Sequence, residues 1–160
     1  FRRVLFRSER LKDSFEVAAA EGIEIIFTPT DLGEVHPNTV KFILTKEDGS
    51  VSNITGSSIG GGNILIFDID GQEVAFTGKN PTLLAQYKDL PGVISKVSSV
   101  LYEENINIAN MRVYRDGKGK TATMALEADS MITETVTEKI RSIKEMNSVQ
   151  SINPVVEGVF

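Results

Sequence analysis

A tight turn between a strand-like and a helix-like segment constrains the fold of this sequence more than any other feature. The turn, Asp89-Leu90-Pro91-Gly92-Val93-Ile94, follows a strand-like run over 82–87 and opens an amphipathic run that continues to Glu104. Gly92 has no Cβ, so backbone amides at the start of the helix can come close to a small ligand, and their partial positive charge favours a carboxylate. We therefore predict a strand, a turn and a helix that together could bind a small molecule.

The residues after the turn predict a complete βαββαβ unit. Apolar residues recur at helical spacing after Val93, two alternating runs read as strands on either side of a glycine-containing turn, and a second helical period precedes a final strand. The predicted elements are a strand over 82–87, a helix over 93–104, strands over 106–115 and 121–127, a helix over 136–146 and a strand over 149–152. This order, over about 75 residues, is that of a ferredoxin-like unit.

The turn and the segment Glu104-Asn105-Ile106-Asn107-Ile108 resemble the pattern of the ACT family of small-molecule regulatory domains. The resemblance implies that such domains pair edge to edge and bind amino acids beside the first turn. Carried over by position, the ligand-binding residues are Tyr87, Asp89, Gly92, Val93, Ile94 and Asn107. Asp89 and Tyr87 stand where some family members have Asn and His, so the identity of the ligand stays open.

RNA-recognition domains share the βαββαβ order, but their central strands carry aromatic residues for base stacking and meet phosphate with a basic surface. Here these strands offer Met111, Val113, Met124 and Leu126, with Tyr114 as the lone aromatic residue, and the chain has a net charge of −5. A negative protein repels a polyanion. We predict no nucleic-acid partner.

The region before the ACT-like unit predicts one short helix and an antiparallel meander. Leu11, Phe15, Ala18 and Ala19 form a helical face that ends at Gly22, and the expected strands are Ile23–Phe27, 40–44, 51–55, 63–67 and 73–76, with hairpin turns at Asp48-Gly49 and Asp70-Gly71. One helix covers such a sheet incompletely. The predicted fold class is α+β: an incomplete antiparallel α/β region at 9–78, followed by a ferredoxin-like ACT domain at 79–155 and a tail at 156–160.

The first eight residues are expected to be foreign to the protein. Arg2-Arg3-Val4-Leu5-Phe6-Arg7-Ser8 reads like the translation of a common sequencing adapter, and the chain starts at Phe1 without an initiating methionine. The alternative is a native basic start to the helix that follows. The first interpretation predicts a truncated N-terminus.

Two further motifs extend the resemblance. The segment Val35-His36-Pro37-Asn38-Thr39 precedes one strand, and Gly56-Ser57-Ser58-Ile59-Gly60-Gly61-Gly62-Asn63 is expected to link two others. With the ACT-like unit, they resemble the allosteric-substrate-binding region and ACT domain of the beta subunit of bacterial iron–sulfur L-serine dehydratases, from about Glu9 to Val155. The family's N-terminal stretch, with a serine-rich segment, is absent.

That resemblance implies a regulatory subunit of a lyase that converts L-serine to pyruvate and ammonia, a reaction that feeds gluconeogenesis. The implied catalytic partner is a cysteine-bearing alpha subunit with a [4Fe–4S] cluster. The present sequence contains no cysteine, so no cofactor is expected in it. The alternatives are the regulatory tail of a phosphoglycerate dehydrogenase, with a dinucleotide-binding domain upstream, and a free-standing ACT amino-acid sensor.

The glycine-rich segment has two interpretations. Ser58, Gly60, Gly61 and Gly62 could bind an anion or amino acid, but three successive glycines also permit unusual φ values in a turn, and no Lys-Ser/Thr follows them as in a P-loop. Both interpretations stay open.

No metal site or catalytic residue is predicted. His36 is the sole histidine, which excludes a paired-histidine site and favours a role in the turn. Asp68, Asp70 and Glu73 are better explained by a hairpin than by a metal. We expect a cytoplasmic protein without a membrane span or secretory signal, whose ACT domain self-associates through its sheet edges.

Overall fold

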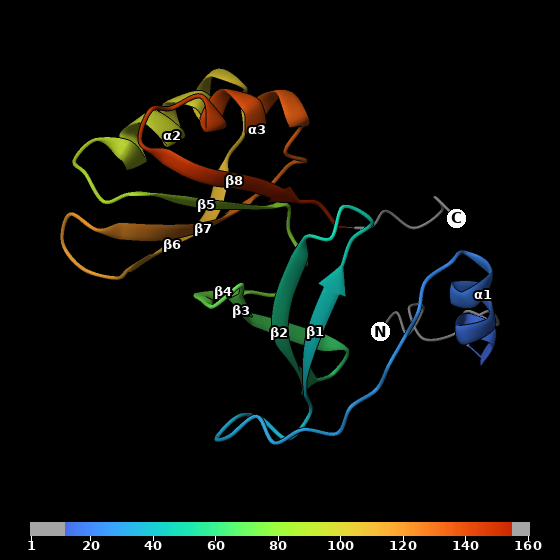
Figure 1. Cartoon of the computed structure of the whole chain (residues 1–160). Helices are drawn as coiled ribbons and strands as arrows, with labels where there is room; N and C mark the ends of the chain where they lie inside the picture. The colour runs from blue at the N-terminus through green and yellow to red at the C-terminus, as the bar shows by residue number, and fades with distance from the viewer. Residues whose placement is uncertain (1–11, 155–160) are drawn as a thin grey trace. The chain divides into compact units, whose positions relative to one another are not determined.

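A computed structural model of the chain describes residues 12–154, which form two compact units, 12–35 and 36–154. The adapter-like segment and the tail at 156–160 lie outside the described residues. In the first unit, helix α1 (Ser14–Ala20) confirms the predicted helix (Figure 1). The ring of Phe15 packs edge-on against that of Phe27, with ring centroids 5.8 Å apart.

The predicted strand Ile23–Phe27 is wrong. Residues 23–27 have no regular secondary structure, and both Ile26 and Phe27 are 76% exposed. A strand needs a hydrogen-bonded neighbour, and the described part of the first unit, 12–35, contains no strand with which this segment could pair. Its apolar, β-branched composition therefore does not suffice to make a strand.

The second unit begins with the predicted meander. Strands β1 (Thr39–Thr45), β2 (Val51–Gly60), β3 (Asn63–Ile69) and β4 (Gln72–Phe76) pair antiparallel in the order β1-β2-β3-β4, with hairpins at both predicted turns. Strand β2 is longer than expected, because Gly56 allows pairing to continue to Gly60. A Cβ at Gly56 would lie 2.7 Å from Cδ1 of Ile66 and 3.1 Å from the carbonyl oxygen of Leu65.

The predicted ferredoxin-like unit is confirmed. Its elements are β5 (Thr82–Lys88), α2 (Val93–Glu103), β6 (Ile108–Arg115), β7 (Thr121–Ala128), α3 (Glu134–Arg141) and β8 (Met146–Ile152). The four strands pair antiparallel in the order β6-β7-β5-β8, and both helices cover one face of the sheet (Figure 1). Helix α3 ends at Arg141, earlier than predicted. Ile143, in the turn after the helix, and Met146, the first residue of β8, still pack against the core.

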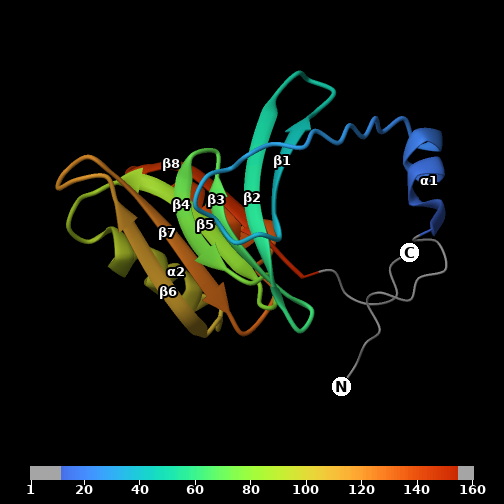
Figure 2. The same cartoon turned by 90° about the horizontal axis from the view of Figure 1, so that it is seen from below.

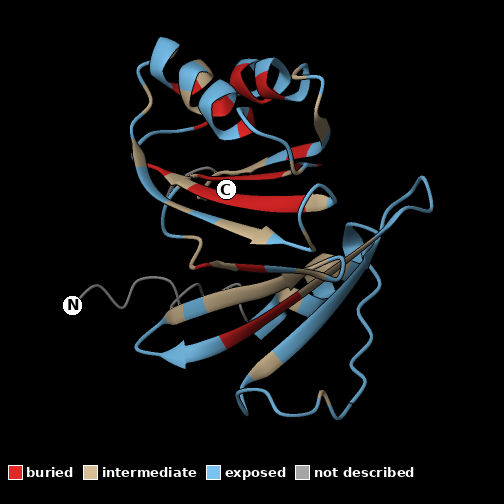
Figure 3. Ribbon diagram, turned by 90° about the vertical axis from the view of Figure 1, so that its left-hand side faces the viewer, coloured by how far each residue is buried: buried red, intermediate tan, exposed pale blue. Residues whose placement is uncertain are grey.

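The central strands β5 and β7 are buried on both faces. One face carries Leu83, Tyr87, Met124 and Leu126, which form a core with the two helices. The opposite face carries Leu84 and Ala125, which pack against Val74 and Phe76 of β4. Buried residues therefore gather in these strands and on the helix faces turned toward them (Figure 3). The ferredoxin-like sheet is the middle layer between the helices and the β3–β4 hairpin.

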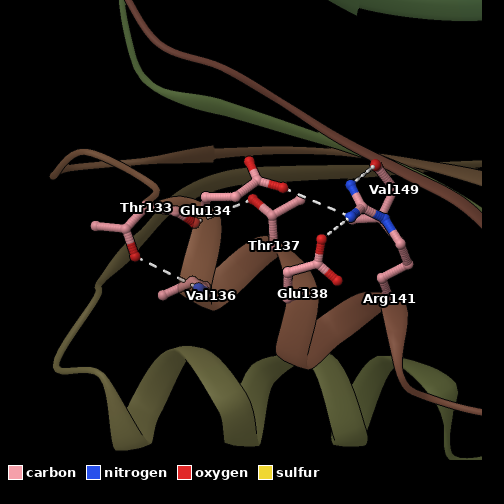
Figure 4. Close-up of polar contacts among 7 residues, drawn as sticks. All are labelled: Thr133, Glu134, Val136, Thr137, Glu138, Arg141 and Val149. Carbon is pink, nitrogen blue, oxygen red and sulfur yellow. Dashed lines mark hydrogen bonds and ion pairs between the residues drawn. The ribbon is translucent and has the colours of Figure 1, made fainter.

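Helix α3 is fixed at both ends (Figure 4). Thr133 caps its N-terminus, where its Oγ1 accepts a hydrogen bond from the backbone N–H of Val136 at 3.4 Å. At the other end, the guanidinium of Arg141 donates to the carbonyl of Val149 at 3.0 Å and also pairs with Glu138. The arginine thus joins the end of the helix to β8, as its position in the last turn favours.

Candidate functional site

The turn between β5 and α2 has the backbone geometry that the sequence predicts. Gly92 is the N-cap residue of α2, with φ of 90°, and no side chain caps this end of the helix. The carbonyl of Gly92 accepts the hydrogen bond of the Lys96 N–H at 3.0 Å. An ideal Cβ at Gly92 would meet no atom within 4 Å. This position therefore favours glycine because its φ is positive, not because a side chain would lack space. The first backbone amides of α2 have no side-chain acceptor at the N-cap.

Asp89 fixes this turn to the β6–β7 hairpin. Its Oδ2 accepts hydrogen bonds from Nε of Arg115 at 2.9 Å, from Nη2 of the same guanidinium and from the N–H of Gly119 at 3.1 Å. These hydrogen bonds lower the pKa of the Asp89 carboxyl below its usual range, and the bonds from Arg115 have a larger effect than the bond from Gly119. The negative charge of Asp89 is therefore already paired inside the chain.

Arg115 and Gly119 are site residues that sequence reasoning missed. The signal was present: Arg115 ends a predicted strand directly before the glycine-containing turn, and the antiparallel order brings that turn beside the end of β5. The backbone N–H of Asp89 also donates to the carbonyl of Lys120 at 2.9 Å. The hairpin and the first turn thus form one connected structure.

The predicted residues at the turn divide into core and surface. Tyr87 and Val93 are 2% and 1% exposed and belong to the core under the helices. Burial, and then the Asp89 carboxylate, raise the pKa of the Tyr87 phenol. Ile94, in contrast, is 45% exposed and lies in the first turn of α2. Of these side chains, that of Ile94 is the one accessible to a ligand outside the folded domain.

Asn107 lies at the other end of the sheet. Its Nδ2 donates to Oδ2 of Asp129 at 2.5 Å, and its carbonyl accepts from the N–H of Asp129. Asp129 follows the end of β7 that pairs with the start of β5, whereas the first turn follows the end of β5. Seven residues at about 3.4 Å each separate the two ends of β5 by about 20 Å. One domain therefore does not bring Asn107 to its own first turn.

The two motifs of the first sheet come together. The hydroxyls of Thr39 and Ser57 lie 2.7 Å apart, and the N–H of Ser58 donates to the carbonyl of Asn38 at 2.9 Å. Nδ1 of His36 accepts from the N–H of Asn38, which fits the predicted turn role of this histidine.

The glycines of the second motif form the turn between β2 and β3. Gly60, Gly61 and Gly62 all have positive φ, and Nδ2 of Asn63 donates to the carbonyl of Gly60 at 3.2 Å. These conformations explain the three glycines without a ligand. Binding by Ser58 and the glycines remains a prediction.

The acidic hairpin between β3 and β4 is held by its own side chains. Oδ1 of Asp70 accepts from the N–H of Asn53 at 2.6 Å, and Oδ1 of Asp68 accepts from the N–H of Gly71. Among residues 12–154, no three His, Cys, Asp or Glu side chains gather closely enough to hold a metal ion. In the same range, no helix combines the length and the apolar character that crossing a membrane requires.

We predict that replacing Asp89 by Asn removes stability at neutral pH and part of the acid sensitivity of the fold. Because folding lowers this pKa, the charged form stabilises the fold above the usual value of 3.8, and that contribution disappears as the pH falls through the lowered pKa. Urea unfolding at pH 7 and at about pH 2 should show a difference from the native chain at neutral pH only. Asp116→Asn, at an exposed position of the neighbouring hairpin, is the control. Equal stability of Asp89→Asn and the native chain at pH 7 would contradict this role.

Comparisons with known proteins agree with this fold. The ACT domain family matches residues 82–145. The chain is 35% identical over 144 residues to "Probable L-serine dehydratase, beta chain" of Bacillus subtilis (strain 168), with 90% of this chain and 65% of that protein covered. "L-serine dehydratase, beta chain" of Peptoniphilus asaccharolyticus is 34% identical over 145 residues, with the same shares covered.

A third relative belongs to another enzyme class. "D-3-phosphoglycerate dehydrogenase" of Methanocaldococcus jannaschii is 31% identical over 137 residues, which are 86% of this chain and 26% of that protein. The chain spans slightly less than two thirds of the length of the two beta chains. Residues 82–145 therefore belong to the ACT domain family, within a chain that is similar to L-serine dehydratase beta chains along nine-tenths of its length.

Proposed function

We propose that this chain regulates an L-serine dehydratase by binding L-serine or a related amino acid at the first turn of its ACT domain. The observation that carries the proposal is the similarity to two dehydratase beta chains, combined with a first turn whose helix start has no side-chain cap. Regulation would follow from differential affinity: a ligand that binds one arrangement of the subunits more tightly shifts the equilibrium toward it.

The electrostatics of the first turn favour the carboxylate of the amino acid. The first amides of α2 carry partial positive charge, and Gly92 presents no side chain in front of them. An unpaired Asp89 would repel such a ligand, but Arg115 neutralises it. In this proposal Asp89 positions the turn. Because Arg115 and Gly119 already donate to Oδ2 of Asp89, the ligand's ammonium group would bind the lone pairs of the Asp89 carboxylate that these donors do not occupy.

Asn107 would join the site from a second copy of the chain. Strand β6 is an edge strand of its sheet, so its outer backbone groups have no partner strand in the described part of the chain. Asn107 and Arg115 each lie four positions from Met111. An antiparallel β6–β6 pair with its two-fold axis at Met111 would therefore place Asn107 of one copy opposite Arg115 of the other, beside that copy's first turn.

The catalytic chemistry would belong to a partner chain. The implied [4Fe–4S] cluster needs thiolate ligands, and this sequence has no cysteine, so its residues do not fit the cluster. We assign the cluster and the serine-to-pyruvate reaction to a cysteine-bearing catalytic subunit, and regulation to this chain. A phosphoglycerate dehydrogenase tail is the second candidate, because such an enzyme also matches 86% of the chain. Co-purification with a cysteine-bearing chain that supplies iron and activity favours the first; a chain with a dinucleotide-binding domain favours the second.

We predict that Ile94→Asp weakens L-serine binding about tenfold more than Ile94→Asn does. Ile94 is exposed at the second position of α2, where a carboxylate stabilises the helix start but repels the ligand's carboxylate. The two variants differ mainly in charge, and titration calorimetry with L-serine measures both against the native chain. Circular dichroism checks the fold. Equal affinities of the two variants would place the serine carboxylate elsewhere.

A further inference from the structure

All three glutamines of the chain line one cleft. Gln72, Gln86 and Gln150 are 14 and 64 positions apart along the sequence, yet they surround the same small, open cleft of about 60 Å³ within the second unit. A cleft of this volume holds a few water molecules or one small polar group of a ligand, such as a carboxamide, with the rest of the ligand outside it. The cleft is distinct from the first turn, because none of the residues from Asp89 to Ile94 lines it.

The strand registers explain how the glutamines meet. Gln86 of β5 pairs with Thr123 of β7 on one side and with Ser148 of β8 on the other, so the three polar side chains form a row across the sheet. This row lies on the face opposite the helices. Gln150 belongs to the next row, beside Leu84. Gln72, the first residue of β4, approaches from the other sheet, and Figure 2 shows β3 and β4 in front of β5 and β7.

One hydrogen bond joins the two walls of the cleft. The Thr123 hydroxyl donates to Oε1 of Gln72 at 2.7 Å. This bond fixes the orientation of the Gln72 amide, so its NH₂ group is left as a donor. Gln86 is half-buried and Gln150 is exposed, so their side-chain amides can exchange bound water for the polar groups of a ligand. The cleft therefore offers amide donors and acceptors beside the buried apolar side chains of Val74 and Leu84.

The charges of the cleft select the class of ligand. Of residues 12–154, Asp70 is the one ionisable residue that lines it, and no Lys, Arg or His of that range does. An anion would lose hydration without gaining a cationic partner and would face the carboxylate of Asp70. A carboxamide, in contrast, has the same donor and acceptor pattern as the glutamine side chains. We propose that this cleft binds a small neutral or cationic molecule that carries a carboxamide, held between β4 and the ferredoxin-like sheet.

The test uses the full chain with ¹⁵N in its glutamine side chains. Every labelled NH₂ signal then reports this cleft, because the chain has no other glutamine. The probe is L-serinamide, which replaces the carboxylate of L-serine by a carboxamide. We expect it to shift the glutamine signals with a Kd on the order of 1 mM, and L-serine to bind this cleft at least about tenfold more weakly. Unmoved glutamine signals, or equal shifts with L-serine, would overturn the proposal.

Variants separate binding from structure. Gln86→Met keeps the length of the side chain but removes its amide. It should lower the affinity for L-serinamide about tenfold. Asn110→Ala removes an exposed amide that pairs with Glu127 and should leave the affinity unchanged. If Gln86→Met folds like the native chain and binds L-serinamide equally well, the cleft is not the site.

The first-turn variant distinguishes this cleft from the proposed serine site. Ile94→Asp should weaken the binding of L-serine at the first turn and leave the binding of L-serinamide in the glutamine-lined cleft unchanged. Loss of the glutamine shifts in Ile94→Asp would mean that the two ligands share the first turn, which contradicts a separate cleft. Unchanged L-serine binding in Ile94→Asp, with intact glutamine shifts, would contradict only the proposed function.

Discussion

Truncating Leu101 to alanine should lower the free energy of unfolding by about 2–5 kcal/mol. Leu101 lies on the inner face of α2, is fully buried, and packs with Val97, Met124 and Leu126 in the core between the helices and the sheet. The substitution removes buried methyl groups and leaves a cavity that the surrounding strands can fill only in part, because their opposite face is also packed.

The matched control for this core substitution is Leu90→Ala. Leu90 is 41% exposed in the first turn, so the same chemical change should alter stability by about 0.5 kcal/mol or less. Urea unfolding followed by circular dichroism measures both variants. A Leu101→Ala variant that is as stable as Leu90→Ala would contradict the packing of α2 on this sheet.

Mixing two weakly binding variants, Asn107→Ala and Ile94→Asp, should restore tight L-serine binding if Asn107 acts across a β6–β6 pair. Each variant alone should weaken L-serine binding by tenfold or more. Asn107→Ala removes a hydrogen bond to the charged ligand, and Ile94→Asp adds a carboxylate that repels the ligand's carboxylate. In a mixed dimer, one site would contain both substitutions and the other would contain neither. After equilibration of equal amounts, about a quarter of all sites should be intact.

Titration calorimetry gives the number of tight sites in the mixture, and sedimentation gives the oligomeric state. Asn110→Ala, on the same strand, is the control for a general effect on β6. A mixture that binds no better than its two components would contradict a site shared between copies. A native chain that stays monomeric at concentrations where it binds serine would contradict it as well.

The amino-acid sequence by itself predicts the ferredoxin-like unit because its elements are local. The strand-like runs of β5 and β7 and the helical period of α2 depend on residues a few positions apart. The helical period matches the burial of α2 in the structure, whereas β5 and β7 are buried on both faces because β4 packs against the face opposite the helices. The turn at Gly92 is also a local property, since its positive φ follows from the absence of a Cβ. The same local reasoning fails at Ile23–Phe27, where strand-forming residues have no partner strand in the described part of their unit.

Only the tertiary structure decides which of the predicted site residues can act together. Asp89 is paired with Arg115, 26 positions away, because the order β6-β7-β5 brings a hairpin to the first turn. Asn107, only 18 positions from Asp89, lies at the opposite end of the sheet. The glutamines show the same effect: no spacing in the sequence relates Gln72 to Gln86 and Gln150, and their cleft arises from the packing of two sheets. Local periodicity determines the elements, whereas the pairing order and the packing of layers bring distant side chains together.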